Sequence, residues 1–350
     1  MREITIRERK IGTSHPPLIV AELSANHNGS LDSALKLVEA AHEAGIHAIK
    51  LQTYTPDTIT LDIKDGDFLI TDETSLWRGK TLYDLYREAY TPWDWHIPIF
   101  ERCKELGMLA FSTPFDETAV DFLEGLDVLC YKIGSPEIVD IPLIRKVGAT
   151  GKPLILSTGG ATRVEISEAV SAAKSVGCRD IILLKCTMSY PSQPDDANLR
   201  TIPDMISTFD VPVGISDHSL GIGVAIASVA FGACVIEKHL TYDRREGGVD
   251  SAFSMEPAEF KLLVGESYRA WRGLGHVHYG PLPSEKVSYS HRPSLYFIED
   301  IPLGTVIQEA HISSLRPNKG LPPKEIDQVI GRKLLFGVKK GMPVSWECFS

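Results

Sequence analysis

A glutamate, a lysine and a histidine stand in a row at positions 237–239, where the apolar run FGACVI leads into VIEKHLT. A short apolar run of this kind is typical of a buried strand. Ionisable groups at the end of such a strand are costly to bury unless they meet partners or a ligand. The row therefore indicates a functional site, and other apolar runs of the chain end in similar residues.

Two lysines, Lys50 in AIKLQ and Lys132 in CYKIG, have apolar neighbours on both sides. We expect each lysine to meet an anion, because an unpaired ammonium group is costly to bury. Hydroxyl groups stand near the ends of the same and other runs, at Thr113, Ser135, Ser157 and Ser216. Together these groups predict a cage for phosphate and carboxylate. The alternative is that these residues are ordinary polar residues of exposed loops.

Two histidines, His218 in GISDHS and His239 in IEKHLT, end the last two apolar runs. Neutral imidazoles that converge there could share one divalent metal ion, although two histidines in separate strands are also common as structural residues. With two imidazoles and no thiolate nearby in the sequence, such a site would keep open coordination positions. This favours a Lewis acid that holds substrate oxygens over a structural zinc.

Eight strand-like runs alternate with amphipathic stretches such as 30–45 and 163–177. The runs are 17–23, 47–53, 108–113, 128–134, 152–158, 180–187, 211–216 and 233–239. Apolar strands separated by helices predict parallel strands covered by helices. Eight such units over about 250 residues fit a (β/α)8 TIM barrel, whose catalytic residues lie at the C-terminal ends of the strands. A doubly wound sheet is the alternative, but no GxGxxG follows the first run.

The composition changes after residue 275. We expect a catalytic barrel over 1–275, a linker rich in Pro, Ser and Gly over 276–293, and a small β-rich domain over 294–350. In the last part, IPLGTVI is echoed by VKKGMPV. A domain of this size is marginally stable by itself, so we expect it to pack against another surface.

Charge and hydropathy exclude several partners. The formal net charge of −10 argues against nucleic acid. No apolar run reaches the ~18 residues needed to span a bilayer, and the charged N-terminal sequence lacks the features of a signal peptide. The six cysteines are scattered without a CxxC pair. They predict reduced thiols in a cytoplasmic protein.

Nine motifs of the chain resemble, in order and spacing, those of the sialic acid (nonulosonic acid) synthase family. They are AELSANHNGS, AIKLQT, STPFD, YKIGSPE, ILSTGG, CTMSYP, GISDHS, IEKHLT and GGVDSAFSM. The resemblance implies a TIM barrel followed by an antifreeze-like (SAF) domain. Within the family, AELSANHN and LQTYTPDTITLD most resemble the pseudaminic acid synthases.

The resemblance implies an activity. A pseudaminic acid synthase condenses phosphoenolpyruvate with 2,4-diacetamido-2,4,6-trideoxy-L-altrose, in a metal-dependent reaction that gives pseudaminic acid and phosphate. An N-acetylneuraminate or legionaminate synthase, which uses another N-acetylated amino sugar, is the alternative within the family. A metal-dependent barrel aldolase and a non-catalytic sugar-binding protein are the alternatives from other classes.

The resemblance also implies residue roles. Glu22 is the catalytic carboxylate, and His218 and His239 bind the metal, with Mn²⁺ expected and Mg²⁺ or Co²⁺ as alternatives. The residues that bind phosphoenolpyruvate are Lys50, Thr113, Lys132, Ser135, Ser157 and Ser216. The residues that face the sugar are Gln52, Glu137, Tyr190 and Asp250.

Two further positions concern the partner subunit and the substrate. Arg316, in SSLRPNKG, matches an arginine that family members insert into the active site of the partner subunit. The resemblance therefore implies a domain-swapped homodimer. Met188 stands where some neuraminate synthases have Asn, and its more apolar side chain suits a deoxy sugar.

Overall fold

The computed structural model describes residues 3–73 and 75–350. The residues up to Gly275 form one compact unit, and His276–Ser350 form a second. Each unit has a hydrophobic core of its own. Among the described residues, no helix is both long enough and apolar enough to cross a membrane.

The first unit is a closed barrel of eight parallel strands, which confirms the predicted TIM barrel. The strands are β3 (Leu18–Glu22), β4 (Ala48–Thr53), β5 (Leu109–Pro114), β6 (Tyr131–Ile133), β7 (Leu154–Ser157), β8 (Ile181–Cys186), β9 (Val213–Ser216) and β10 (Val235–His239). They follow one another around the barrel in chain order, and β10 closes it by pairing with β3. Each strand coincides with one of the predicted apolar runs.

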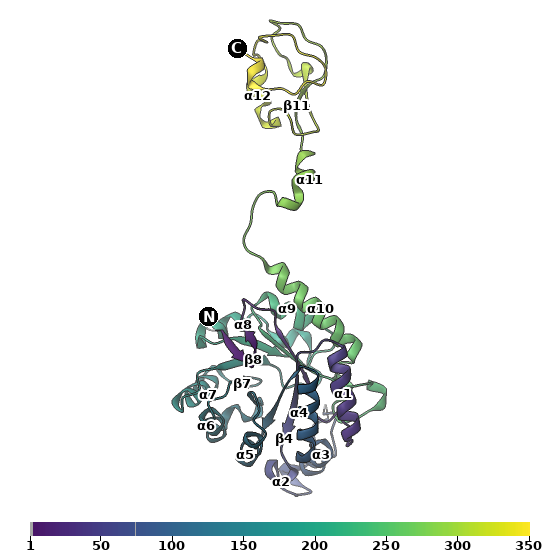
Figure 1. The fold of residues 1–350 in the computed structure, drawn as a ribbon, viewed down its shortest axis with the longest axis vertical. Coiled ribbons are helices and arrows are strands. Elements are labelled where there is room, and N and C mark those ends of the chain that lie inside the picture. The colour runs from purple at the N-terminus through teal and green to yellow at the C-terminus, as the bar shows by residue number, and fades with distance from the viewer. Residues whose placement is uncertain (1–2, 74) are drawn as a thin grey trace. The chain divides into compact units, whose positions relative to one another are not determined.

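Helices surround the strands in chain order (Figure 1). They are α1 (Leu31–Glu43), α4 (His96–Glu105), α5 (Glu117–Gly125), α6 (Ile141–Ala149), α7 (Arg163–Ser175), α8 (Thr201–Phe209), α9 (Gly223–Ala230) and α10 (Pro257–Leu274). The two helices expected at 30–45 and 163–177 are confirmed as α1 and α7. Ser30 caps α1 by accepting the Ser33 N–H, and a capping box of Thr162 and Glu165 starts α7.

The strand register brings polar residues to the same level at the C-terminal rim. Glu22 on β3 lies beside His239 on β10 and beside Lys50 on β4. Glu237 on β10 lies beside Ser216 on β9. Since side chains alternate between the two faces of a strand, this register decides which of them share the barrel interior.

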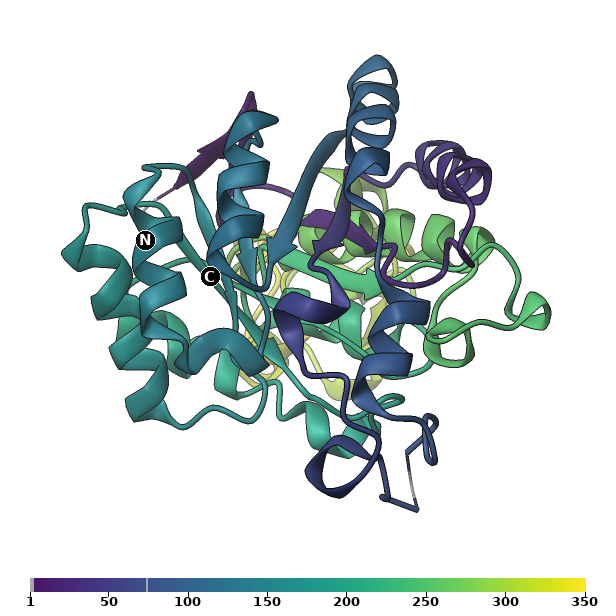
Figure 2. The ribbon, with the colours of Figure 1, turned by 90° about the horizontal axis from the view of Figure 1, so that it is seen from below.

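A hairpin of β1 (Ile4–Ile6) and β2 (Arg9–Ile11) precedes the barrel and was not predicted. It buries Ile4, Ile6 and Ile11 against interior residues of the barrel strands. A long segment between β4 and β5 contains α2 (Pro56–Ile59) and α3 (Leu82–Ala89). Figure 2 shows the hairpin and this segment at opposite ends of the barrel.

The second unit contains a two-stranded antiparallel sheet, β11 (Ser294–Phe297) and β12 (Ile312–Leu315), and two short helices, α11 (Lys286–Ser290) and α12 (Ile326–Val329). Its core includes Leu295, Phe297 and Val344. The repeated runs IPLGTVI and VKKGMPV form turns rather than strands. The central glycines, Gly304 and Gly341, have φ values of 81° and 85°, in the left-handed region that glycine favours.

Candidate active site

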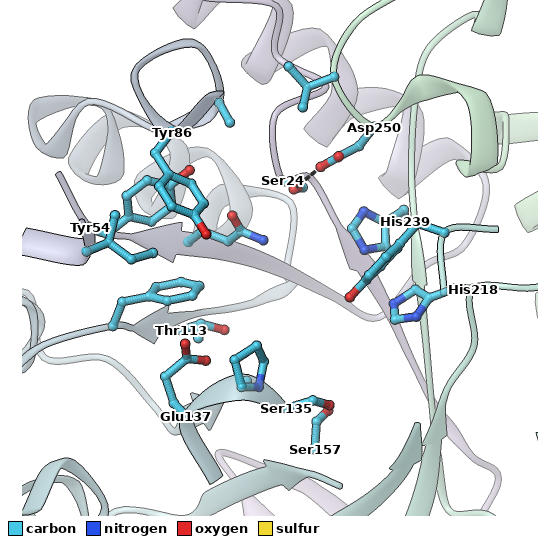
Figure 3. Close-up of a pocket in the computed structure, with 18 of the residues that line it drawn as sticks. Ser24, Tyr54, Tyr86, Thr113, Ser135, Glu137, Ser157, His218, His239 and Asp250 are labelled. Carbon is cyan, nitrogen blue, oxygen red and sulfur yellow. Dashed lines mark hydrogen bonds between the residues drawn. The ribbon is translucent and has the colours of Figure 1, made fainter. Parts of the chain in front are cut away.

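A cavity of about 470 Å³ opens at the C-terminal ends of the barrel strands. Most of the predicted site residues line it. They are Lys50, Gln52, Thr113, Lys132, Ser135, Glu137, Ser157, Tyr190, Ser216, His218, His239 and Asp250. The strand-end pattern in the sequence therefore identified a set of side chains that the fold brings together (Figure 3).

Two buried lysines and two buried glutamates form a compact charge cluster, and all of its members except Glu22 line this cavity. Lys50 Nζ lies 2.6 Å from Glu22 Oε2 and 3.3 Å from Glu237 Oε1. Lys132 Nζ lies 3.7 Å from the same Glu237 oxygen. Ser216 Oγ donates a hydrogen bond to that oxygen at 3.1 Å. The cluster balances two positive charges against two negative ones, which makes its burial tolerable.

The two glutamates differ in their pKa values. Burial raises the pKa of Glu22 above its ordinary value, although Lys50 opposes this shift. Burial also acts on Glu237, but Lys132 and Lys50 outweigh it and hold the pKa of Glu237 at about 2. Glu237 is therefore a fixed negative charge, whereas Glu22 is the carboxylate that more readily takes a proton.

Glu22 is fully buried and does not line the cavity itself. Its Oε1 accepts the N–H of Ser24 at 3.1 Å, and its Oε2 faces Lys50. The predicted catalytic carboxylate thus lies directly behind a cavity-lining lysine. Ser24 itself lines the cavity and donates a short hydrogen bond to Asp250 (Figure 3).

The predicted anion-binding hydroxyls line the same cavity as the two lysines. Ser135 Oγ accepts the N–H of Gly159 at 3.0 Å, and Ser157 Oγ is buried without a hydrogen-bond partner among the described residues. Lys50 Nζ lies 3.4 Å from Thr113 Oγ1. A Cβ atom at Gly159 would approach Ser135 Oγ to 2.7 Å, so glycine is required for this close approach.

The two predicted metal ligands lie together, with ring centroids 5.2 Å apart. His218 Nδ1 donates to the carbonyl oxygen of Thr187 at 2.7 Å, so in the neutral imidazole Nε2 carries the lone pair. Burial, followed by the charge of His218, holds the pKa of His239 well below its ordinary value. His239 Nδ1 is buried without a hydrogen-bond partner among the described residues.

The residues present fit a divalent ion held by two imidazoles. Within residues 3–73 and 75–350, no group of three or more His, Cys, Asp or Glu side chains has the spacing of a metal site. A metal at His218 and His239 would therefore take its other ligands from water and substrate, as expected for a Lewis acid.

The other wall of the cavity comes from the segment between β4 and β5. Tyr54 and Tyr86 lie across the cavity from the two histidines (Figure 3). Apolar side chains complete this wall, at Ile59, Ile70, Leu82 and Leu85. Trp77 closes one side, where its indole N–H donates to the carbonyl oxygen of Val249 at 3.0 Å. This wall was not predicted from the sequence.

Glu137 brings a second titratable carboxyl group to the cavity. Its Oε2 is buried without a hydrogen-bond partner among the described residues. Burial raises the pKa of Glu137 to about 7. Such a carboxyl group is prepared to bond a hydroxyl or amide of a ligand.

Sequence reasoning did not assign a role to two other neighbours of the site, Glu237 and Cys186. Glu237 bridges the two lysines, a role that only the strand register reveals. Cys186 lines the cavity beside His218. Burial raises the pKa of this thiol, but the hydrogen bond and charge of His218 lower it to about 7. Lys238 lies outside the cavity, with its Nζ 2.7 Å from Asp217 Oδ2 in a buried structural pair.

Two remaining positions lie apart from the cavity lining. Met188 is 44% exposed and packs against Gly159 and Gly160, where a Cβ on Gly160 would approach its methyl carbon to 2.6 Å. Arg316 belongs to the second unit, where it directly follows β12 and is exposed.

Comparison with known proteins adds independent information. The NeuB family model matches residues 37–279, and the SAF domain model matches residues 292–350, which confirms the predicted C-terminal SAF domain. The chain is 42% identical over 332 residues to the pseudaminic acid synthase of Helicobacter pylori, across 94% of this chain and 97% of that protein. It is 34% identical over 342 residues to the N,N'-diacetyllegionaminic acid synthase of Legionella pneumophila, across 96% and 95% of the two chains.

A solved structure agrees in fold. The N-acetylneuraminic acid synthetase from Leptospira borgpetersenii, in complex with citrate, matches with a TM-score of 0.73 and 36% sequence identity. The match covers 82% of this chain and 95% of that one.

Proposed function

Because this chain belongs to the NeuB family, we propose that it condenses phosphoenolpyruvate with an N-acetylated amino sugar to make a nonulosonic acid, and that this product is pseudaminic acid. The sugar is then 2,4-diacetamido-2,4,6-trideoxy-L-altrose, and inorganic phosphate is released. The names of several relatives, including the one that is 42% identical, support this substrate. A legionaminate or neuraminate synthase is the alternative, supported by more distant relatives.

One observation carries the proposal. The two lysines, Glu237 and the histidine pair line one cavity, together with hydroxyls suited to a phosphate, and Glu22 lies directly behind Lys50. The two ammonium groups and the hydroxyls of Thr113, Ser135 and Ser157 would hold the phosphate and carboxylate of phosphoenolpyruvate. The aldehyde of the sugar would then lie toward the histidines.

The reaction forms one carbon–carbon bond and breaks one carbon–oxygen bond. C3 of phosphoenolpyruvate attacks the sugar aldehyde and leaves a cationic centre at C2. Water adds to C2, and phosphate leaves with the electrons of the bond between C2 and the phosphate oxygen, so the water oxygen becomes the ketone oxygen. Of the two protons of that water, one ends on the former aldehyde oxygen, which becomes a hydroxyl, and the other leaves with phosphate. Glu22 stabilises the cation and accepts a proton from the water, which its raised pKa suits it to do. Lys50, at 2.6 Å, fixes the orientation of this carboxylate.

His218 and His239 would hold a divalent metal ion, for which we propose Mn²⁺. When bound, the ion would polarise the aldehyde carbonyl and stabilise the negative charge that develops on its oxygen. The chain's own contribution is to orient the two imidazoles. The hydrogen bond that His218 donates to the Thr187 carbonyl fixes the orientation of one ring. Burial lowers the pKa of His218, but Cys186 and the Thr187 carbonyl outweigh it and raise that pKa, whereas burial holds the pKa of His239 well below its ordinary value.

The apolar wall of the cavity supports a deoxy sugar. Ile59, Ile70, Leu82 and Leu85 offer no hydrogen bond to a sugar hydroxyl, but they can bury a methyl group. Glu137, Asp250 and Gln52 remain to bond the amide groups and hydroxyls. This division suits a sugar with a C6 methyl group and two N-acetyl groups.

The six cysteines, none in a disulfide, support a cytoplasmic location for the reaction.

Phosphate release distinguishes the proposed reaction from those of the other protein classes. The purified protein should release phosphate from phosphoenolpyruvate only when an N-acetylated amino sugar is present. A barrel aldolase would release no phosphate, and a sugar-binding protein would bind the sugar without turnover. Release of phosphate that does not depend on any sugar would contradict a synthase.

Removal of the metal should abolish turnover. We expect excess chelator to stop phosphate release and Mn²⁺ to restore it, because the aldehyde is a weak electrophile without a Lewis acid. His239→Ala should lose most of the metal-dependent turnover and should bind Mn²⁺ more weakly by calorimetry. His276→Ala, a histidine of the second unit that is absent from the cavity lining, is the matched control. Full activity in excess chelator would contradict a metal-dependent reaction.

We also propose a domain-swapped homodimer in which Arg316 reaches the sugar site of the partner subunit. The small core of the second unit and the exposure of Arg316 support this assembly. If it forms, Arg316→Ala in one subunit damages the site of the other subunit.

Mixed dimers test this assembly. In a heterodimer of Arg316→Ala and Glu22→Ala subunits, one site carries both substitutions and the other carries neither, so activity should partly return. If each subunit used its own arginine, every site would carry one substitution and mixing would restore nothing. Differently tagged subunits, purified as heterodimers, show that exchange has occurred before activity is measured.

A further inference from the structure

A second cavity, of about 520 Å³, lies at the N-terminal end of the barrel, far from the strand ends that form the candidate active site. The hairpin β1–β2 forms one side, and the residues that precede β4 and β5 form the other. Basic side chains dominate its polar lining, which comprises Arg7, Arg9, His42, His47 and a single carboxylate, Glu8. Neither the proposed reaction nor the family match assigns this cavity a role.

The hydrogen bonds of His47 fix where its proton lies. The backbone N–H of Ile19, on β3, donates to His47 Nδ1 at 2.9 Å. A nitrogen that accepts a hydrogen bond carries no proton, so the neutral ring must carry its proton on Nε2. Burial, followed by the charge of Arg9, lowers the pKa of His47 to about 3, so the ring is neutral at physiological pH.

The proton on Nε2 points toward another donor. Arg9 Nη2 lies 3.5 Å from His47 Nε2, and a guanidinium group has no lone pair to accept a hydrogen bond. The two groups are therefore donors that face each other without an acceptor between them. Nη2 has one protein acceptor, the carbonyl oxygen of Pro17 at 3.2 Å. Among the described residues, Arg9 forms no ion pair, although burial lowers its pKa.

We propose that this cavity is a binding site for a phosphate group, held between the Arg9 guanidinium and the His47 Nε2–H. An oxyanion there would accept from both donors and neutralise the half-buried guanidinium. Tetrahedral phosphate offers several acceptor oxygens, which suits a fork of N–H groups and an imidazole N–H that converge from different elements. The volume of the cavity accommodates either free phosphate or a small phosphorylated metabolite.

Replacement of Glu8 should strengthen phosphate binding, the opposite of the effect expected for replacement of Arg9. Glu8 lines the same cavity, is exposed and forms no ion pair within the described residues. If the cavity binds an anion, Glu8 repels that anion, and Glu8→Gln should strengthen binding. If Glu8 were instead the natural counter-ion of Arg9, Glu8→Gln would also lower the melting temperature of the phosphate-free protein, whereas a Glu8 that only repels the anion would leave that temperature unchanged.

Calorimetric titration tests the site. The active site also binds phosphate in our account, so the titration uses the Lys132→Ala protein, in which that binding is weakened. We expect one phosphate site to persist, to weaken at least tenfold with Arg9→Gln, and to be unaffected by Lys10→Gln. Lys10 is the matched control because it lies on the same strand, β2, but pairs with Glu3 outside the cavity. A parallel titration uses glucose 1-phosphate. Tighter binding of glucose 1-phosphate than of phosphate would indicate a phosphorylated metabolite as the ligand, and tighter binding of phosphate would indicate the free ion.

Nuclear magnetic resonance of ¹⁵N-histidine-labelled wild-type protein needs no variant to fold. Phosphate should shift the signal of the His47 Nε2–H group. The Nδ1 signal should remain that of an unprotonated nitrogen that accepts a hydrogen bond. The proposal is overturned if neither phosphate nor glucose 1-phosphate binds to the Lys132→Ala protein, if Arg9→Gln leaves binding intact, or if the His47 signal does not move at saturating phosphate. Because none of these measurements depends on turnover, failure here would leave the proposed synthase reaction untouched.

Discussion

Replacing Lys132 with alanine should weaken phosphoenolpyruvate binding by about 2–5 kcal/mol, the loss typical when one partner of a buried charge pair is removed. This corresponds to roughly 30-fold to several-thousand-fold in the dissociation constant. Lys132 is 2% exposed and lies 3.7 Å from Glu237. The fold should tolerate the change, because Glu237 keeps Lys50 at 3.3 Å and Ser216 at 3.1 Å. Calorimetry with phosphoenolpyruvate measures the effect directly.

Two further variants sharpen this prediction. Lys132→Arg should not restore binding, because its planar fork needs a cavity of a different shape. Lys146→Ala, which removes a lysine that pairs with Asp121 outside the cavity, should leave the affinity unchanged. An unchanged affinity in Lys132→Ala would remove this lysine from the phosphoenolpyruvate site.

Replacing Glu22 with glutamine should lower kcat by about 10²- to 10⁴-fold, the range typical for loss of a general acid–base group. The amide oxygen of glutamine can still accept the N–H of Ser24, so the local backbone keeps its hydrogen bond. The amide can neither take a proton from water nor stabilise a cation. Steady-state kinetics of phosphate release give kcat, and thermal unfolding shows that the variant is folded.

Binding measurements distinguish a role of Glu22 in the chemical step from a role in binding phosphoenolpyruvate. If the carboxylate acts in the chemical step, Glu22→Gln should bind phosphoenolpyruvate with an affinity close to that of the wild type while kcat falls. A variant that turns over within tenfold of the wild type would show that another group, such as Glu137, carries out the acid–base step.

The barrel could be predicted from the sequence because its strands are buried on both faces. Runs such as PLIVAEL and DIILLKCT are mostly apolar, and each contains a strand, β3 and β8. The rim residues followed from the same pattern, since parallel strands in a barrel all end on one face. This is why Lys50 and Lys132, separated by 82 positions, could be assigned to one site before the structure was known.

The pairings inside the site could not be predicted in the same way. The bridge from Glu237 to both lysines depends on the register between β10 and its neighbours, which the runs alone do not fix. The wall that carries Trp77 and Tyr86 comes from the long connection between β4 and β5, which lies outside the alternation of strands and helices that predicts the barrel. The β1–β2 hairpin is only three residues per strand, too short for its alternation to stand out.

The choice of sugar distinguishes a pseudaminic acid synthase from the other synthases of the family. The measurement is the specificity constant, kcat/KM, for phosphoenolpyruvate-dependent phosphate release with three sugars: 2,4-diacetamido-2,4,6-trideoxy-L-altrose, 2,4-diacetamido-2,4,6-trideoxy-D-mannose and N-acetylmannosamine. We expect the highest kcat/KM with the altrose derivative and the lowest with N-acetylmannosamine, whose C6 hydroxyl would meet the apolar wall formed by Ile59, Ile70, Leu82 and Leu85. A kcat/KM that is highest with N-acetylmannosamine would contradict both the proposed substrate and the role given to that wall.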